Sequence, residues 1–385
     1  MPYLDHAATT PLRPEALDAM LPWLRDEYGN ASSQHGPGRR ARVAVENARK
    51  DVAAVLGCEP AEVVFTSGGT EADNLALRGT LTGGPLAETG RPGLVTSAAE
   101  HDAILKPAED LRYAGHPVAI VPPLATGEPD PEALAAATTN ETGLVSAMLV
   151  NNEVGAVADI RRIADDAHAR GALCHTDAVQ ASGLLPLAVD DLGVDLLSIS
   201  GHKVGGPKGA GALFVRSGTP LAPLVRGGAQ ERGRRGGTEN VAALVGFATA
   251  LRLAEAERED TAARLTGLRQ RLTKRLLAHV PGLRVNTPSE AAPHVLSVSL
   301  PPGDAGAIDG EMVLLGLDLA GVQASAGSAC TSGALTPSHV LLAMGVPRQT
   351  AAATVRLSLG RTTTEADVDA AVEAFATVAA RAGHA

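Results

Sequence analysis

Residues 172–203 read ALCHTDAVQASGLLPLAVDDLGVDLLSISGHK, and two short runs within this stretch decide the fold class. Residues 172–175 and residues 195–200 have the composition of short strands, and each run ends in a polar cluster. In sheets of parallel strands covered by helices, ligands bind outside the carboxyl ends of the strands. The stretch therefore predicts two strands whose ends carry a ligand site.

The alternation of strands and helices begins well before this stretch. From about residue 60, short β-branched runs precede longer helical patterns: strand 62–65 before helix 71–81, strand 93–96 before helix 102–111, and strand 144–150 before helix 160–170. This order is typical of βαβ units. We expect an α/β fold with a large, mostly parallel sheet covered by helices.

The last third of the chain has a different order of elements. Residues 227–237 form a loop rich in glycine and arginine, and residues 241–280 are dominated by helix formers. Beyond them the pattern predicts strands at 285, 295–300 and 355–359, helices at 310–319 and 339–344, and a last helix with a capping box at Thr362-Thr363-Thr364-Glu365. We expect a large domain over residues 14–255 and a smaller α+β domain formed by residues 1–13 and 256–385.

Composition excludes several classes of protein. At roughly 150 residues per domain, 385 residues suggest two or three domains. Aromatic residues make up 2% and the net charge is −10, which disfavours binding to nucleic acid or to an anionic membrane. The 3 cysteines form no C-x-x-C pair, so we expect neither a disulfide framework nor a metal site. With no signal peptide and no apolar run of about 18 residues, we expect a cytoplasmic protein.

One glycine pattern predicts an anion site. Thr66-Ser67-Gly68-Gly69-Thr70-Glu71 follows a predicted strand and opens a helix, where backbone N–H groups and a hydroxyl can bind phosphate. Taken alone, the same pattern also fits a tight turn with a helix cap and no ligand. Residues 36–41 match G-x-G-x-x-A without a preceding strand, and residues 201–208 resemble a P-loop but have glycine where the magnesium-binding hydroxyl belongs.

Asp177 and Lys203 stand at two successive strand ends. Pyridoxal phosphate needs such a pair, because a lysine forms the Schiff base and an aspartate keeps the pyridine nitrogen protonated. Taken singly, Lys203 reads as a solvated lysine and Asp177 as a loop cap. Their joint placement with the phosphate site favours the cofactor.

The chain resembles the cysteine desulfurases, in particular their group I subclass, within the fold-type I (class V aminotransferase-like) pyridoxal-phosphate enzymes. The resemblance extends from about residue 3 to Arg361 and rests on seven segments in the order and approximate spacing of that family. They are Leu4-Asp5-His6-Ala7-Ala8-Thr9-Thr10, Thr66-Ser67-Gly68-Gly69-Thr70-Glu71, Val150-Asn151-Asn152-Glu153-Val154-Gly155, His175-Thr176-Asp177-Ala178-Val179-Gln180, Ser200-Gly201-His202-Lys203, Arg235-Gly236-Gly237-Thr238 and Gly327-Ser328-Ala329-Cys330-Thr331-Ser332.

The resemblance implies a fold-type I large domain that binds pyridoxal 5'-phosphate. Lys203 would form the Schiff base, Asp177 would pair with the pyridine nitrogen, and Gln180 would bind the ring hydroxyl. The expected phosphate ligands are Gly69, Thr70, Ser200 and His202. Thr238 would reach the phosphate of the neighbouring subunit, which implies a homodimer.

The resemblance also assigns residues to the substrate. Asn152 would contact cofactor and substrate, and Arg356 would bind the substrate carboxylate through its guanidinium fork. His101 would stack on the cofactor ring and carry protons. The alternatives from the residues alone are a structural salt bridge for Arg356 and a surface loop histidine for His101.

Cys330 is the expected nucleophile, because it lies in a run of small residues suited to an exposed, mobile loop. Cys58 and Cys174 read as inert packing residues. The implied reaction converts L-cysteine to L-alanine and leaves a persulfide on Cys330, whose sulfur passes to an acceptor protein for iron–sulfur cluster, tRNA or other thio-cofactor synthesis. The alternatives are a pyridoxal-phosphate enzyme for selenocysteine or another amino acid, and a catalytically silent homologue.

Overall fold

The structure, a computed structural model, describes residues 1–82, 86, 90–302, 306–326 and 336–383. Its main element is a seven-stranded sheet in the order β1-β7-β6-β5-β4-β2-β3. The strands are β1 (Val63–Thr66), β2 (Gly93–Ser97), β3 (Val118–Val121), β4 (Thr142–Ser146), β5 (Leu173–Asp177), β6 (Leu196–Ser200) and β7 (Gly211–Val215). Neighbours from β3 to β6 pair in parallel, and β7 runs antiparallel to β1 and β6. The predicted α/β fold with a mostly parallel sheet is confirmed.

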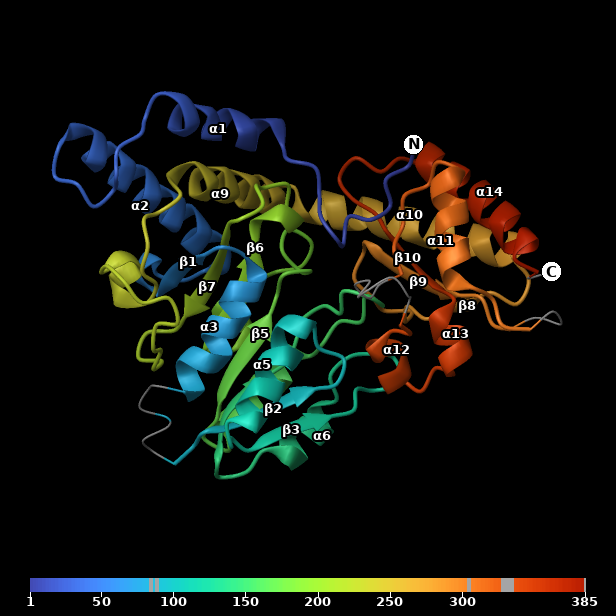
Figure 1. Ribbon diagram of the computed structural model, residues 1–385, viewed down its shortest axis with the longest axis horizontal. Helices are drawn as coiled ribbons and strands as arrows, with labels where there is room; N and C mark the ends of the chain where they lie inside the picture. Colours follow the sequence, from blue (N-terminus) through green and yellow to red (C-terminus); the bar gives the residue numbers. More distant parts are fainter. Residues whose placement is uncertain (83–85, 87–89, 303–305, 327–335, 384–385) are drawn as a thin grey trace.

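Helices cover both faces of this sheet (Figure 1). They are α1 (Pro14–Arg25), α2 (Gly36–Leu56), α3 (Gly69–Leu81), α5 (Asp102–Tyr113), α6 (Pro131–Ala137), α7 (Ile160–His168), α8 (Val189–Leu192) and α9 (Val241–Ala256). Val64 and Leu213 are buried with side chains of α3 and α5, whereas their neighbours Val63 and Phe214 are buried with side chains of α2 and α9. None of the helices described has the length and apolar character needed to cross a membrane. Because both faces are covered by helices, a ligand can bind this sheet only outside the ends of its strands.

A second apolar core surrounds a three-stranded antiparallel sheet in the order β10-β9-β8. Its elements are β8 (Arg284–Val285), β9 (Val295–Ser299), β10 (Thr354–Ser358), α10 (Arg258–His279), α11 (Gly310–Leu319) and α14 (Glu365–Arg381). The short helices α12 (His339–Ala343) and α13 (Arg348–Ala352) pack instead with Ala99, Val154 and Ala156 in a separate buried cluster. The N-terminal segment joins this core, since Leu4 is buried in it and Asp5 bridges to Ser358. Figure 1 shows the N-terminus beside the C-terminal helices.

Residues 241–280 are helical as predicted and form two helices that meet at Glu257, whose carboxylate accepts hydrogen bonds of 3.0 and 2.9 Å from Arg13. Two other local predictions differ from the structure. The strand predicted at 144–150 is β4, which ends at Ser146. The capping box lies at Thr364 and Asp367 rather than at 362–365, because the helix begins at Glu365 and makes Thr364 its N-cap. The domain boundary between residues 255 and 256 stays a prediction.

A buried ion pair holds the loop that precedes α9. Arg49 on α2 donates to both carboxylate oxygens of Glu231 at 2.7 and 2.8 Å, and the two side chains are each 3% exposed. The backbone N–H of Phe65 donates to the same carboxylate at 2.9 Å. Glu231 adopts a φ of 47°, and Arg232 follows at 56°. These contacts stabilise a left-handed turn that residues other than glycine rarely adopt.

We expect Arg49→Met to lower the free energy of unfolding by about 3–5 kcal/mol, because the Glu231 carboxylate would stay buried without its cation. The matched control is Arg40→Met on the same helix, where the pair with Glu27 is solvent-exposed. Urea unfolding followed by circular dichroism measures both variants. Equal unfolding midpoints for the two variants would contradict this account of the buried pair.

Candidate active site

A cavity of about 840 Å³ opens where the strands of the large sheet end, within the range of about 300–1,000 Å³ typical of small-molecule sites. Residues that follow β1, β2, β4, β5 and β6 line one side, and residues of the second core line the other. The predicted site residues in its lining are Gly69, Thr70, His101, Asn152, Asp177, Gln180, Ser200, His202, Lys203 and Arg356.

Two predicted site residues stand apart. Cys330 belongs to residues 327–335, which lie outside the described residues. Thr238 is exposed in the loop before α9 and is not in the described lining of the cavity. Across the described ranges, no group of three or more histidine, cysteine or acidic side chains could hold a metal ion.

One end of the cavity is built to receive an anion. α3 begins at Gly69, directly after Gly68 with its φ of 153°. The first N–H groups of a helix have no partner within the helix and favour negative charge. Ser200 next to them is 1% exposed, and its buried hydroxyl has no hydrogen-bond partner among the described residues. The charge of Glu71 is paired with Arg235, whose Nε donates to it at 2.8 Å, and the same carboxylate accepts the N–H of Ser67 at 2.8 Å. The pattern at residues 66–71 forms the predicted turn and helix start, and the unpartnered Ser200 hydroxyl beside it favours the prediction of an anion site.

Asp177 and Lys203 carry the opposite charges of the site. The Asp177 carboxylate accepts the N–H of Val179 at 2.9 Å, and burial raises its pKa while His101 and Lys203 lower it. Lys203 donates from Nζ to the carbonyl oxygens of Ala7 and Ala8. Burial, followed by the charge of Arg356, lowers the pKa of Lys203 to about 8. A lysine with such a pKa is partly neutral near pH 7 and can attack a carbonyl group.

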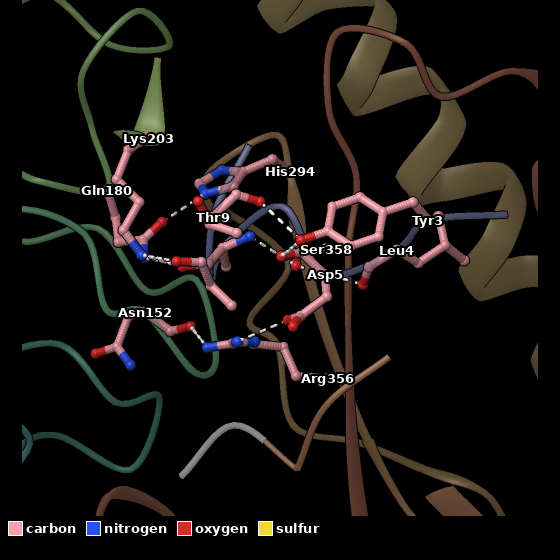
Figure 2. A network of polar contacts seen from close by, with 12 residues as sticks. Tyr3, Leu4, Asp5, Thr9, Asn152, Gln180, Lys203, His294, Arg356 and Ser358 are labelled. Carbon is pink, nitrogen blue, oxygen red and sulfur yellow. Dashed lines mark hydrogen bonds and ion pairs between the residues drawn. The ribbon is translucent and has the colours of Figure 1, made fainter. Parts of the chain in front are cut away.

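Arg356 reaches the cavity from β10. Nη1 donates to the Asn152 carbonyl at 2.9 Å and Nη2 to the Asp5 carboxylate at 3.0 Å (Figure 2). Nε is buried and has no hydrogen-bond partner in the described part of the chain. The salt bridge considered as an alternative therefore exists, yet it leaves guanidinium N–H groups for a ligand carboxylate.

His101 caps the helix that follows β2. Its Nδ1 accepts the N–H of Ala103 at 3.0 Å, so the neutral ring carries its hydrogen on Nε2. The ring is exposed and lines the cavity. This arrangement fixes the ring and leaves Nε2 as the atom that can exchange a proton with a ligand.

Sequence reasoning missed several polar residues around the cavity. Asp73 on α3 lies at its wall, and burial together with Asp177 raises the pKa of this carboxyl. His339 also lines the cavity, and its Nε2 donates to the Glu100 carbonyl at 2.9 Å. His175 lies on β5 itself, and burial lowers its pKa to about 3. Asp73 follows the apolar period of a helix, so no local pattern distinguishes it from a core position.

The two described cysteines are unsuited to nucleophilic chemistry. Burial raises the pKa of the half-buried Cys58 to about 12 and also raises the pKa of the fully buried Cys174. Both thiols therefore stay protonated near pH 7.

Comparisons with known proteins agree with this geometry. Residues 2–371 match the aminotransferase class-V family. A cysteine desulfurase IscS of Dictyoglomus turgidum is 43% identical over 95% of this chain and 91% of its own length. An IscS-like cysteine desulfurase of Mycobacterium tuberculosis is 44% identical over 99% of this chain and 97% of its own length.

Solved structures extend the likeness to the whole fold. A NifS-like protein has a TM-score of 0.90 at 35% identity and covers 99% of this chain and 100% of its own. The structure of SspA in complex with cysteine has a TM-score of 0.81 at 34% identity, covering 93% of this chain and 99% of its own. The fold, with its lysine and aspartate at neighbouring strand ends, places the chain in the aminotransferase class-V family. Within that family it belongs to the cysteine desulfurases.

The pKa of Lys203 can be measured directly on the protein without cofactor. We expect acetic anhydride to label Lys203 with a midpoint near pH 8, well below the roughly 10.4 of an ordinary lysine. Only the neutral amine reacts, and exposed Lys208 serves as the internal reference in the same mass spectra. Arg356→Gln should move the midpoint upward, because it removes a positive charge that disfavours protonation of Lys203. A midpoint above pH 10 in the unchanged protein would contradict the burial argument.

Proposed function

We propose that this protein removes sulfur from L-cysteine with pyridoxal 5'-phosphate as cofactor, forming L-alanine and a persulfide on Cys330. The observation that carries the proposal is the alignment along one cavity of an anion site, a buried carboxylate and a lysine of lowered pKa. The SspA structure in complex with cysteine supports this choice of substrate.

The residues present fit this cofactor. The N-terminus of α3 and the unpartnered Ser200 hydroxyl suit its phosphate, with Thr70 and His202 beside them. A protonated pyridine nitrogen would stabilise the Asp177 carboxylate, which burial otherwise disfavours. When bound, the cofactor supplies an electron sink for negative charge on the α-carbon of the substrate. Lys203 would hold the cofactor, and Gln180 would donate an N–H to its ring oxygen.

The substrate would be bound by groups that already converge on the cavity. Arg356 would pair with its carboxylate, and the side chain of Asn152 would contact both substrate and cofactor. Arg356 is oriented by Asp5 and the Asn152 carbonyl, which reduces the side-chain entropy lost on binding. Nε2 of His101 and the amine of Lys203 would take up and return the protons of the reaction.

The chemical step balances with one thiol of the protein. The Cys330 thiolate would attack the substrate sulfur, so that an S–S bond forms while the carbon–sulfur bond breaks. The electron pair of the broken bond stays with the substrate carbon, which gains a proton and becomes the methyl group of alanine. The outer sulfur of the persulfide would pass to the thiolate of an acceptor protein for iron–sulfur cluster, tRNA or other thio-cofactor synthesis. We place this activity in the cytoplasm.

Incubation with L-cysteine, pyridoxal phosphate and a thiol reductant tests the proposal. We expect alanine and sulfide in equal amounts. Lys203→Ala should abolish both products and the borohydride-trapped link between cofactor and protein. Cys330→Ser should retain that link and lose more than about 99% of both products. Without the Cys330 thiolate, no group attacks the substrate sulfur, so the carbon–sulfur bond of the substrate stays intact. Cys58→Ser is the matched control and should keep near-normal rates. Alanine formation by Cys330→Ser at the normal rate would overturn the persulfide mechanism.

We further propose a homodimer in which Thr238 of each subunit binds the phosphate in the partner's site. Thr238→Ala should weaken cofactor binding about tenfold or more, since a hydrogen bond to a charged group contributes about 1.5–3 kcal/mol. When Thr238→Ala and Lys203→Ala chains are co-expressed, each mixed dimer should contain one site of normal affinity. In that site, Lys203 comes from the Thr238→Ala chain and Thr238 comes from the Lys203→Ala chain. Sedimentation measures the assembly, and equilibrium dialysis the affinity. A monomeric protein, or mixed dimers without a site of normal affinity, would contradict the proposal that Thr238 binds the phosphate in the partner's site.

A further inference from the structure

A second, smaller cavity of about 80 Å³ lies behind the candidate active site. Val179, Gln180 and Lys203 line both cavities and therefore separate them. The smaller cavity is also lined by two buried imidazole rings, His6 and His294. The proposed function leaves both rings without a role.

The amide of Gln180 is held at both of its polar atoms. Nε2 donates to the Ala7 carbonyl at 2.8 Å, and Oε1 lies 3.1 Å from Nε2 of His294 (Figure 2). A carbonyl can only accept, so the NH₂ group of Gln180 must face Ala7. Oε1 then faces His294, whose Nε2 must be the donor. One N–H of Gln180 remains unused in the described structure.

The surroundings of His294 suit the tautomer that this contact requires. The side chain is 4% exposed, and its Nδ1 has no hydrogen-bond partner among the described residues. Burial, with the nearby charges of Arg356 and Lys203, lowers the pKa of His294 to about 3. The ring is therefore neutral, with its hydrogen on Nε2 and an unprotonated Nδ1.

The position of His294 in the fold explains how it can act on the site. It directly precedes β9 in the smaller sheet, and its carbonyl accepts the N–H of Leu359 at 2.8 Å. The backbone of His294 is thus tied to the segment after β10. Its side chain reaches Gln180, which follows β5 of the large sheet. This hydrogen bond connects the second core to a wall of the ligand cavity.

We infer that His294 is a positioning residue: together with the Ala7 carbonyl it fixes the plane of the Gln180 amide, so that an N–H faces the ligand cavity. Ala7 alone holds one atom of the amide and leaves rotation about the side chain possible. Loss of His294 would also leave Oε1 of Gln180 buried without a donor, which favours turning the amide away. The inference rests on the proposed function for one point, that the group receiving this N–H is the ring hydroxyl of pyridoxal phosphate.

Binding of two cofactors distinguishes positioning from a general structural role. The probes are pyridoxal phosphate and its analogue that lacks the ring hydroxyl, measured by equilibrium dialysis on the full chain. We expect His294→Leu to weaken pyridoxal phosphate about tenfold and to leave the analogue within twofold. His294→Gln, which keeps an N–H donor at similar reach, should stay within twofold of the unchanged protein for both.

A double-mutant comparison removes the effect of any general loosening. In a Gln180→Ala background, His294→Leu should cause no further loss of affinity for pyridoxal phosphate, because its effect passes through the amide. If His294→Leu folds poorly, His294→Gln and Gln180→Ala can still be compared. His294→Gln should bind pyridoxal phosphate normally, and Gln180→Ala should bind it weakly. Ring ¹⁵N shifts of the cofactor-free protein should assign the hydrogen of His294 to Nε2.

Equal loss of both cofactors in His294→Leu, or no loss of either, would overturn the inference while leaving the proposed function intact. A hydrogen on Nδ1 would overturn it as well. Failure of the unchanged protein to bind pyridoxal phosphate would instead overturn the proposed function, and this inference with it.

Discussion

The carbonyl oxygen of Ala7 accepts hydrogen bonds from both Lys203 and Gln180. The arrangement of the site depends on this shared acceptor. It holds the N-terminal segment across the ends of β5 and β6. The same segment donates from the Thr10 hydroxyl to the His202 carbonyl at 2.7 Å and pairs Asp5 with Arg356. A segment with little secondary structure of its own thereby connects the two cores, because its polar groups are satisfied by both.

The protonation of Lys203 depends on several charged groups around the cavity rather than on one ion pair. Asp177 and Asp5 favour the protonated form of Lys203, whereas burial and Arg356 oppose it. The net result is an amine that is close to changing its protonation state near neutral pH. The Asp177 carboxylate, the Lys203 amine and the Arg356 guanidinium face one cavity from two sheets, and removing the charge of Asp177 or Arg356 should move the titration of Lys203.

The two sheets contribute different chemistry. Residues at the ends of the large sheet supply the anion site, the carboxylate and the lysine, which the proposed function assigns to the cofactor. Arg356 and His294 come from the smaller sheet and reach the same cavity from the opposite side. The relative placement of the two sheets thus decides where a substrate carboxylate could lie with respect to the lysine.

The sequence by itself determined the elements whose signals are local. Alternating β-branched runs and helical patterns predicted the mostly parallel sheet, and Thr66 to Glu71 predicted the strand, turn and helix start that the structure has. Most predicted site residues, including Asp177 and Lys203, lie at the last residue of a strand or shortly after it and therefore meet at one edge of the sheet, as parallel strands require. Local signals also have limits, since three threonines in a row did not reveal which one caps the last helix.

Only the tertiary structure decided which distant side chains meet. Arg356 and Asp5 are 351 residues apart, Arg49 and Glu231 are 182 apart, and His294 and Gln180 are 114 apart. No periodicity or motif links such positions, because their contact depends on how two separately formed cores pack together. Burial likewise sets the pKa values of Lys203 and His294, and burial is a property of the packed fold rather than of neighbouring residues in the chain.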